Sequence, residues 1–194
     1  MDQGVLFPSS EARHLTRSEL EAGLDYIRNS PKDDGVIEMI VCRPGEGRRR
    51  VLDEGRFDPA VGLMGDNWKI RFSRDSPDGL PDPDTQLNIM NSRVVALIAA
   101  ERGRWPLAGD QLYVDFDLSN GNLPPGSRIG IGDAIIEITP PPHTGCKKFV
   151  ARFGIEAMKF VNSPTGKKLN LRGVNARVIK PGTIRVGDRI RKIT

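Results

Sequence analysis

Residues 128–149 read RIGIGDAIIEITPPPHTGCKKF and contain two short strands, a stop and the start of a helix. The apolar runs 127–131 and 134–139 flank a Gly-Asp pair, which predicts a β-hairpin. Three prolines, beginning at Pro140, end the second strand because proline lacks the N–H that a sheet requires. Apolar residues then recur at helical spacing from Phe149 to Val161, so we expect a helix over 146–161.

The chain from Gly35 onward has the same texture, with short apolar runs separated by Gly, Pro and Asp. We expect strands at 36–43, 49–54, 68–73, 86–90, 111–116, 127–131, 134–139, 173–179 and 183–193. A helix is expected at 92–101, which is rich in good helix formers and stops at Gly103. Together with 21 glycines and 15 prolines, this pattern predicts a strand-rich body with many turns.

Residues 1–34 differ from this body and form a predicted N-terminal extension. Thr16 and Glu19 have the spacing of a capping box, and apolar residues then recur at helical intervals. We expect one amphipathic helix, from about 17 to 29, that packs on a single domain over 35–194. The first residues have no basic region and no apolar stretch of signal-peptide length, so neither export nor a membrane span is expected.

The charge pattern argues against nucleic acid as a partner. The net charge is +4, and charges of both signs are mixed along the chain. The tight cationic run Arg48-Arg49-Arg50 follows a Pro-Gly-Glu-Gly turn, which favours a solvated hairpin over a phosphate-reading patch. Aromatic residues make up 6% of the chain, too few for the stacking platforms that bind single strands.

Cys146 is the candidate reactive residue. A helix start offers unpaired backbone N–H groups and a partial positive charge, both of which favour the thiolate, and His143, Lys147 and Lys148 add donors nearby. The alternative is an inert cysteine that packs as a small hydrophobe. Cys42 ends an apolar run and is expected to be structural. Two distant cysteines without CxxC spacing suit a reducing cytoplasm.

Several other chemistries are unsupported. The chain has two histidines, and it contains no HExxH motif, Walker A motif or spaced CxxC pair. The glycine-rich residues 126–133 lie between strands, without the following helix that a phosphate loop needs. Asp115 and Asp117 alternate with apolar residues, which one face of a strand explains without acid–base chemistry.

Six pieces of sequence occur in an order that resembles a known family. They are GDQL at 109–112, DLS at 117–119 with NLPPG at 122–126, RIGIGDA at 128–134, PPHTGC at 141–146, RGVNARV at 172–178 and GTIRVGDRI at 182–190. Together they resemble the MOSC domain, the C-terminal domain of molybdenum cofactor sulfurase, over about residues 36–194. The chain is similar to the stand-alone members of bacterial type.

The resemblance implies a mostly β fold, a closed or nearly closed barrel with a few helices. It also implies that the Cys146 thiolate carries sulfur as a persulfide or ligates molybdenum in a molybdopterin cofactor. The protein would then be sulfurtransferase-like or a molybdenum-cofactor-dependent reductase. A cysteine desulfurase or a metalloenzyme that accepts sulfur would be its partner.

The resemblance also indicates site residues and shows departures from the family. His143 joins Cys146 as a catalytic candidate, and the cofactor-binding candidates are Asn122, Thr144, Lys147 and Arg172. Other members have Gly-Glu-Asn-Leu where this chain has Asn-Gly-Asn-Leu at 120–123, so a glutamate is missing. The desulfurase domain that uses pyridoxal phosphate is also missing, so this cofactor is not expected. The competing hypothesis is a non-catalytic, partner-binding barrel in which Cys146 is incidental.

Overall fold

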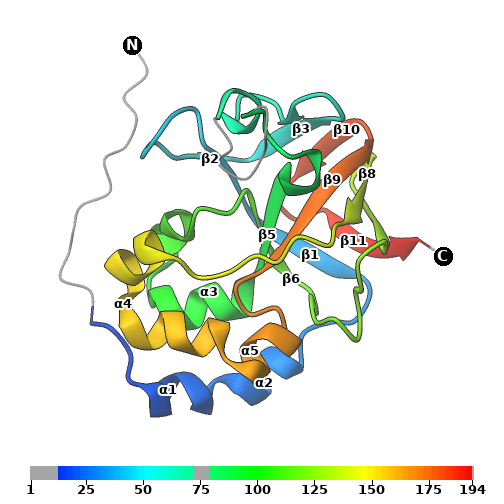
Figure 1. The fold of residues 1–194 in the computed structure, drawn as a ribbon. Coiled ribbons are helices and arrows are strands. Elements are labelled where there is room, and N and C mark those ends of the chain that lie inside the picture. The colour runs from blue at the N-terminus through cyan, green and yellow to red at the C-terminus, as the bar shows by residue number, and fades with distance from the viewer. Residues whose placement is uncertain (1–12, 72–78, 194) are drawn as a thin grey trace.

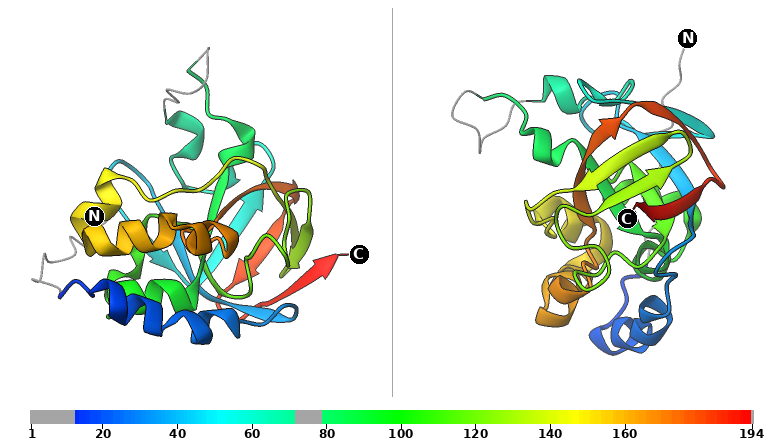
Figure 2. Two further views of the ribbon diagram at one scale, coloured as in Figure 1. Left: turned by 60° about the horizontal axis from the view of Figure 1, so that its bottom comes forward. Right: turned by 90° about the vertical axis from the view of Figure 1, so that its right-hand side faces the viewer.

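A seven-stranded barrel forms the centre of the protein in the computed structural model, which describes residues 13–71 and 79–193. Its strands are β1 (Gly35–Cys42), β5 (Leu87–Asn91), β6 (Leu112–Asp115), β7 (Arg128–Ile131), β8 (Ala134–Ile138), β9 (Val174–Lys180) and β11 (Arg189–Ile193). They follow the order β11-β7-β8-β9-β5-β6-β1, and pairing of β1 with β11 closes the ring. Only β5 and β6 pair in parallel within this described barrel. The expected mostly β barrel is confirmed (Figures 1 and 2).

Further strands extend the barrel at one end. β2 (Arg50–Leu52) pairs with β1, and a small separate sheet has the order β10 (Gly182–Arg185), β3 (Glu54–Asp58) and β4 (Gly62–Leu63). The sequence missed β3 and β4, and it merged β10 and β11 into one strand over 183–193. The strand expected at 68–73 is wrong in its described part, because Trp68–Ile70 is a 3-10 helix and residues 72–73 lie outside the described residues.

The helices gather against one side of the barrel (Figure 1). They are α1 (Arg17–Ala22), α2 (Leu24–Arg28), α3 (Ser92–Ala99), α4 (Lys147–Asn162) and α5 (Pro164–Lys168), with 3-10 turns at Trp68–Ile70, Pro83–Thr85 and Arg102–Ala108. The capping box of Thr16 and Glu19 is present. The single helix expected over 17–29 is instead divided at Gly23.

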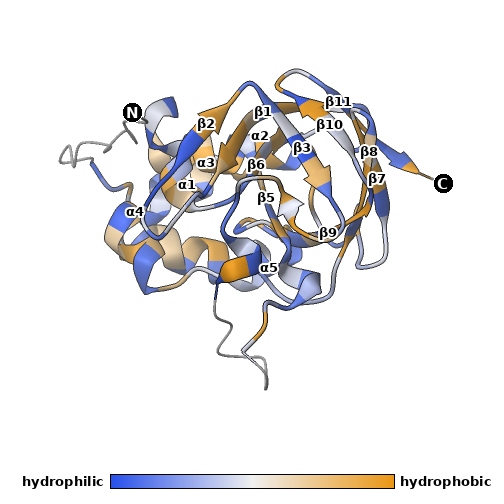
Figure 3. Ribbon diagram, turned by 90° about the horizontal axis from the view of Figure 1, so that it is seen from above, coloured by the Kyte–Doolittle hydropathy of each residue, from blue (hydrophilic) through white to orange (hydrophobic). Residues whose placement is uncertain are grey.

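The hydrophobic core has two parts because the barrel wall is covered on one face. In β6, Leu112 and Val114 belong to one buried cluster and Tyr113 to the other, since neighbouring strand residues point to opposite faces. The first cluster is formed by residues of the barrel strands, the small sheet and the loop after β6, and the second joins the barrel wall to the helices. Hydrophobic residues recur along the barrel strands when the molecule is seen from above (Figure 3).

The N-terminal helices contribute to the second cluster. Leu20 of α1 is fully buried and Ile27 of α2 is 5% exposed. The division of the chain into an extension over 1–34 and a domain over 35–194 stays a prediction. No helix within the described ranges has the length and apolar character needed to cross a bilayer.

Candidate functional site

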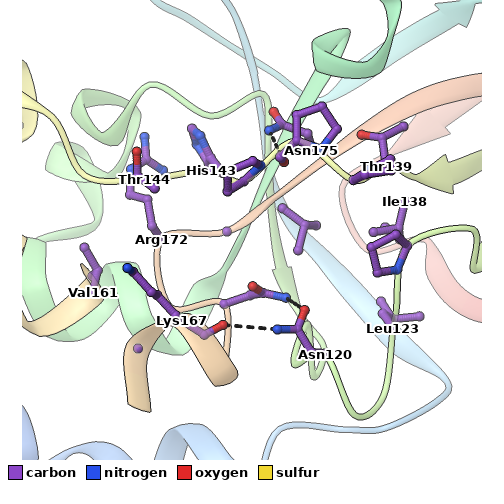
Figure 4. A pocket seen from close by; sticks show the side chains of 18 of the residues that line it. Asn120, Leu123, Ile138, Thr139, His143, Thr144, Val161, Lys167, Arg172 and Asn175 are labelled. Carbon is purple, nitrogen blue, oxygen red and sulfur yellow. Dashed lines mark hydrogen bonds between the residues drawn. The ribbon is translucent and has the colours of Figure 1, made fainter. Parts of the chain in front are cut away.

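Two cavities meet at the segment that joins β8 to α4. The basic cavity, as we call it from its lining, has a volume of about 790 Å³ and is bounded by the turn after β1, the 3-10 helix at Trp68 and the start of α4. The small cavity has a volume of about 350 Å³ and is bounded by residues 138–144, α5 and residues 170–175 (Figure 4). Four residues line both cavities: Pro142, His143, Arg172 and Asn175.

Cys146 lies at the N-cap of α4 and lines the basic cavity. The side chain is exposed and makes no capping hydrogen bond. The residue before it is held by Asn162, whose Oδ1 accepts from the Gly145 amide at 2.9 Å and whose Nδ2 donates to the Gly145 carbonyl at 3.1 Å. The thiol is therefore accessible while its backbone is clamped.

A buried carboxylate, Asp110, organises the wall that the two cavities share. Arg172 Nη1 donates to both carboxylate oxygens, at 3.0 and 2.8 Å, and Arg172 Nη2 donates to the Ala108 carbonyl at 2.9 Å. His143 Nε2 lies 2.9 Å from Asp110 Oδ1. The Arg172 guanidinium also stacks over the Phe149 ring of α4, with 5.1 Å between Cζ and the ring centroid.

These contacts determine the charge states of the group. Burial alone would raise the pKa of Asp110, but Arg172 and His143 outweigh it, so the pKa is lowered and the carboxylate is ionised. Burial and then Arg172 lower the pKa of His143, against the opposing effect of Asp110, so the imidazole is neutral. Because an ionised carboxylate only accepts hydrogen bonds, the proton of this neutral ring belongs on Nε2 and Nδ1 carries a free lone pair.

A second polar network supports the proline segment from the barrel. Arg43, at the end of β1, forms a fork with Asp66 through two bonds of 2.9 Å and donates to Asn88 Oδ1 at 2.9 Å. Asn88 Nδ2 then donates to Asn175 Oδ1 at 2.6 Å, and Asn175 Nδ2 donates to the Pro141 carbonyl at 2.8 Å. The segment that carries His143 and leads to Cys146 is thus tied to the barrel strands.

Cationic residues outnumber acidic ones in the lining of the basic cavity, although Arg43 and Arg172 are paired with the buried Asp66 and Asp110. Its cationic lining residues are Arg43, Arg49, Arg71, Lys148, Arg152 and Arg172, and its described acidic lining residues are Glu46 and Asp82. Arg49 and Arg152 converge on Gly109, because a Cβ placed there would lie 3.6 Å from Arg49 Nη2 and 3.9 Å from Arg152 Nη1. Gly109 itself has a positive φ of 95°, which glycine adopts without strain.

Neither of these arginines is neutralised by a carboxylate within the described residues. Arg49 donates to the carbonyls of Pro106 and Arg48, and Arg152 donates to the carbonyl of Leu107. Burial and then the charges of Arg152 and Arg43 lower the pKa of the Arg49 guanidinium. Like charges held together without a counter-ion are characteristic of an anion-binding site.

The structure brings together only some of the residues proposed from sequence. Cys146, His143 and Arg172 line the basic cavity, whereas Thr144 lines the small cavity. Lys147 is exposed and does not line either of these cavities; its neighbour Lys148 lines the basic one.

Asn122 also lies outside the lining of both cavities. Its Nδ2 donates to the carbonyls of Asp117 and Lys32, at 2.8 and 3.0 Å, and its Oδ1 accepts from Lys192 Nζ at 3.0 Å. These contacts join the loop after β6 to the chain before β1 and to β11, which is a structural role.

Sequence reasoning did not identify Asp110, Arg49 or Arg152 as residues of the candidate site. Asp110 belongs to the GDQL piece, yet nothing local shows that it meets Arg172, which is 62 positions away. The run at 48–50 was interpreted as a solvated hairpin, and the structure divides it: Arg48 is exposed, whereas Arg49 is half-buried in the cavity wall. Arg152 lies on α4, the helix that begins after Cys146. This nearness in sequence was the local signal that could have placed Arg152 near the thiol.

Comparison with known proteins supports a family assignment. Residues 79–191, more than half of the chain, match the family model of the MOSC domain. The chain is similar to the YuaD protein from Bacillus subtilis, with 18% identity and a TM-score of 0.58 over 80% of this chain and 93% of that one. It is also similar to YiiM from Escherichia coli, with 21% identity and a TM-score of 0.53 over 82% and 70%. The search of curated proteins found no match.

Proposed function

Because the chain belongs to the MOSC domain family, we propose that its basic cavity holds a molybdenum–pterin cofactor and that the Cys146 thiolate ligates the metal. One observation carries the proposal: an exposed cysteine and an excess of cations line the same cavity of about 790 Å³. A bare sulfur relay needs an accessible thiol but no cavity of this size. A large anionic ligand needs both the volume and the charge.

The described residues fit such a ligand. Arg49 and Arg152 provide guanidinium groups for a phosphate, since planar paired donors match phosphate oxygens. Trp68 Nε1 and Arg172 Nε are buried atoms without an acceptor in the described structure, and both residues line the cavity. Buried donors of this kind normally have a partner, so a ligand rich in acceptors suits them.

The thiolate of Cys146 supplies the soft ligand that molybdenum requires. When bound, the cofactor would supply two-electron redox chemistry at the metal. Asp110 orients His143 by accepting from Nε2, which leaves Nδ1 able to take or return a proton beside the cavity. Arg172 keeps Asp110 ionised, so the imidazole keeps this tautomer. The arrangement supports a molybdenum-dependent reductase.

A sulfur carrier is the second candidate, supported by the exposure of Cys146. A persulfide forms when a thiolate takes the terminal sulfur from a desulfurase persulfide, whose own thiolate is the leaving group. Mass spectrometry after incubation with a cysteine desulfurase and cysteine tests this: added sulfur on wild-type protein but not on Cys146→Ser supports it. Absence of added sulfur counts against it, and slow alkylation of Cys146 at neutral pH favours a partner-binding barrel instead.

The cofactor proposal is tested by protein expressed in a host that makes molybdenum cofactor. Metal analysis and pterin fluorescence should give matching molybdenum and pterin contents for wild type. Arg49→Gln should lose most of both, because it removes a guanidinium from the cavity wall. Arg48→Gln is the matched control, since this exposed neighbour does not line the cavity. Molybdenum-free wild-type protein, or equal losses in the two variants, would contradict the proposal.

A further inference from the structure

The small cavity is bounded by groups whose chemistry is different from that of the basic cavity. Its apolar side is formed by Leu123, Ile138, Val161 and four prolines, and its polar side includes Thr144, Lys167 and Asn170. Figure 4 shows the labelled side chains around the space, with Lys167 below Thr144 and Arg172 and with Leu123 and Ile138 on the opposite side of the view. A volume of about 350 Å³ is within the range that holds a small organic molecule.

The charged residues of this lining indicate the charge of the ligand that would fit. No aspartate or glutamate is present among the described lining residues, and the cations are Lys167 and Arg172. Arg172 is already neutralised by Asp110, whereas Lys167 has no ion-pair partner within residues 13–71 and 79–193. Lys167 is an exposed residue of α5 that lines the cavity, so the lining carries one uncompensated positive charge at its solvent side, which matches a ligand with a single negative charge.

Hydrogen-bonding capacity in the wall supports the same conclusion. Most amides around the space are already engaged: Asn162 holds Gly145, Asn175 holds Pro141 and Asn120 donates to the Lys167 carbonyl. Arg172, which is 7% exposed, has a buried Nε without an acceptor in the described structure. Arg172 borders both cavities, whereas Lys167 lines the small cavity alone of the two, and its ammonium has no hydrogen-bond partner within the described residues, so an acceptor oxygen fits beside it.

We propose that the small cavity is a second binding site, which takes a small organic monocarboxylate with an apolar body. The carboxylate pairs with the Lys167 ammonium, and the apolar body packs against Leu123, Ile138 and the prolines. The proposal does not depend on a cofactor in the basic cavity. His143 and Arg172 belong to both walls, so an occupant of the small cavity contacts the residues that border the thiol site.

Binding of benzoate to the full chain, measured by calorimetry, tests this proposal. Benzamide has the same shape without the charge, acetate has the charge without the ring, and phosphate is an inorganic anion. Benzoate should bind about tenfold or more tightly than each of the three. Equal affinity for benzamide would refute the charge requirement, and equal affinity for acetate or phosphate would refute the apolar one.

Substitutions of two neighbouring lysines in α5 test whether benzoate binds in the small cavity. Lys167→Gln should weaken benzoate binding about tenfold, and Lys167→Arg should restore it in large part. Lys168→Gln is the matched control, because this adjacent exposed lysine does not line the small cavity and should leave the affinity unchanged. Equal weakening in both glutamine variants would show nonspecific attraction and overturn the assignment.

Nuclear magnetic resonance gives a second readout on the same samples. The chain has two histidines, and only His143 lines the cavities. Benzoate should shift the ring resonances of His143 and leave those of His14 in place. Binding that leaves His143 unshifted would place benzoate elsewhere. Because no metal or pterin is needed, failure here is distinct from failure of the cofactor proposal.

Discussion

Asp110 is the residue on which the geometry of the site depends most. It is fully buried; both of its carboxylate oxygens accept from Arg172, and Oδ1 also contacts His143 Nε2. A buried ion pair adds little net stability when intact, because desolvation offsets the attraction. Loss of one partner is costly, since the remaining charge stays buried and unpaired.

Asp110→Asn should therefore destabilise the protein by about 3–5 kcal/mol, measured by chemical denaturation. Asp53→Asn is the control, because Asp53 is exposed and its side chain forms no hydrogen bond or ion pair within the described residues. The double variant Asp110→Asn/Arg172→Met should recover part of the loss, since it removes the stranded cation. A loss in Asp110→Asn no larger than in the control would show that the pair is not desolvated.

His143 makes stability depend on pH in a defined direction. Burial and Arg172 lower its pKa in the folded state, whereas an unfolded chain has the ordinary value of 6.5. The folded state therefore binds this proton less readily, and the stability contributed by the neutral ring is present above 6.5 and lost as pH falls below it. Asp110 opposes this lowering of the pKa, and the charge of Arg43 adds to it.

The free energy of unfolding should consequently fall as the pH drops below about 6.5, and the fall should be smaller in His143→Gln. Denaturant titrations at several pH values measure both slopes. Parallel pH profiles for wild type and variant would mean that His143 is not the group responsible.

At the scale of single elements, α4 has an unexpected interruption. Gly154 has φ 86° and ψ 166°, a conformation that side chains other than glycine essentially never adopt. A Cβ at this position would also lie 2.8 Å from His14 Nδ1. The helix that begins at Cys146 is thus kinked where the chain before α1 crosses it.

Gly154→Ala should destabilise the protein by about 1–3 kcal/mol, and thermal denaturation would measure this as a lower midpoint. Gly103→Ala provides the comparison, because a Cβ there meets no atom within 4 Å. Equal midpoints for the two variants would show that the kink is not required by packing.

The sequence predicted an element correctly where the residues that determine it lie close together in the chain. The capping box at Thr16, the hairpin at 128–138 and the proline stop before Cys146 are of this kind. At the kink of α4, a Cβ on Gly154 would meet His14, which is 140 positions earlier by the residue numbers. The 3-10 helix at Trp68 replaces an expected strand, and the residues just before it are bonded to Arg43, which pairs with Asp66 and accepts from the Asn67 amide. Both places involve contacts between distant segments.

At the scale of the whole molecule, the fold could be predicted from the sequence, whereas most of the site could not, because the site is formed by segments that are distant in sequence. Local strand and turn patterns predicted a strand-rich body, and the resemblance of the ordered motifs to the MOSC domain implied that this body is a barrel. The cations of the basic cavity come from the chain after β1, the 3-10 helix at Trp68, α4 and the chain before β9. These cations come together only when the barrel closes. The net charge of +4 therefore gave no sign that several cations line one cavity.

The barrel and its helical cover should unfold together. Leu20 of α1, Tyr113 of β6 and Phe153 of α4 share one buried cluster, so loss of the helices would expose the apolar outer face of the barrel wall. In a Trp68→Phe variant, Trp105 alone reports on the helical side by fluorescence, and circular dichroism reports on the whole. Coincident midpoints are expected, and an earlier fluorescence transition would show that the helices are a separate unit.

The central claim, that Cys146 is a metal ligand in an anion-binding cavity, is tested most directly by X-ray absorption at the molybdenum edge. The sample is protein from a cofactor-competent host, compared with Cys146→Ser prepared in the same way. Wild type should show one more sulfur ligand at molybdenum than the variant. Identical sulfur coordination in the two proteins would contradict the account.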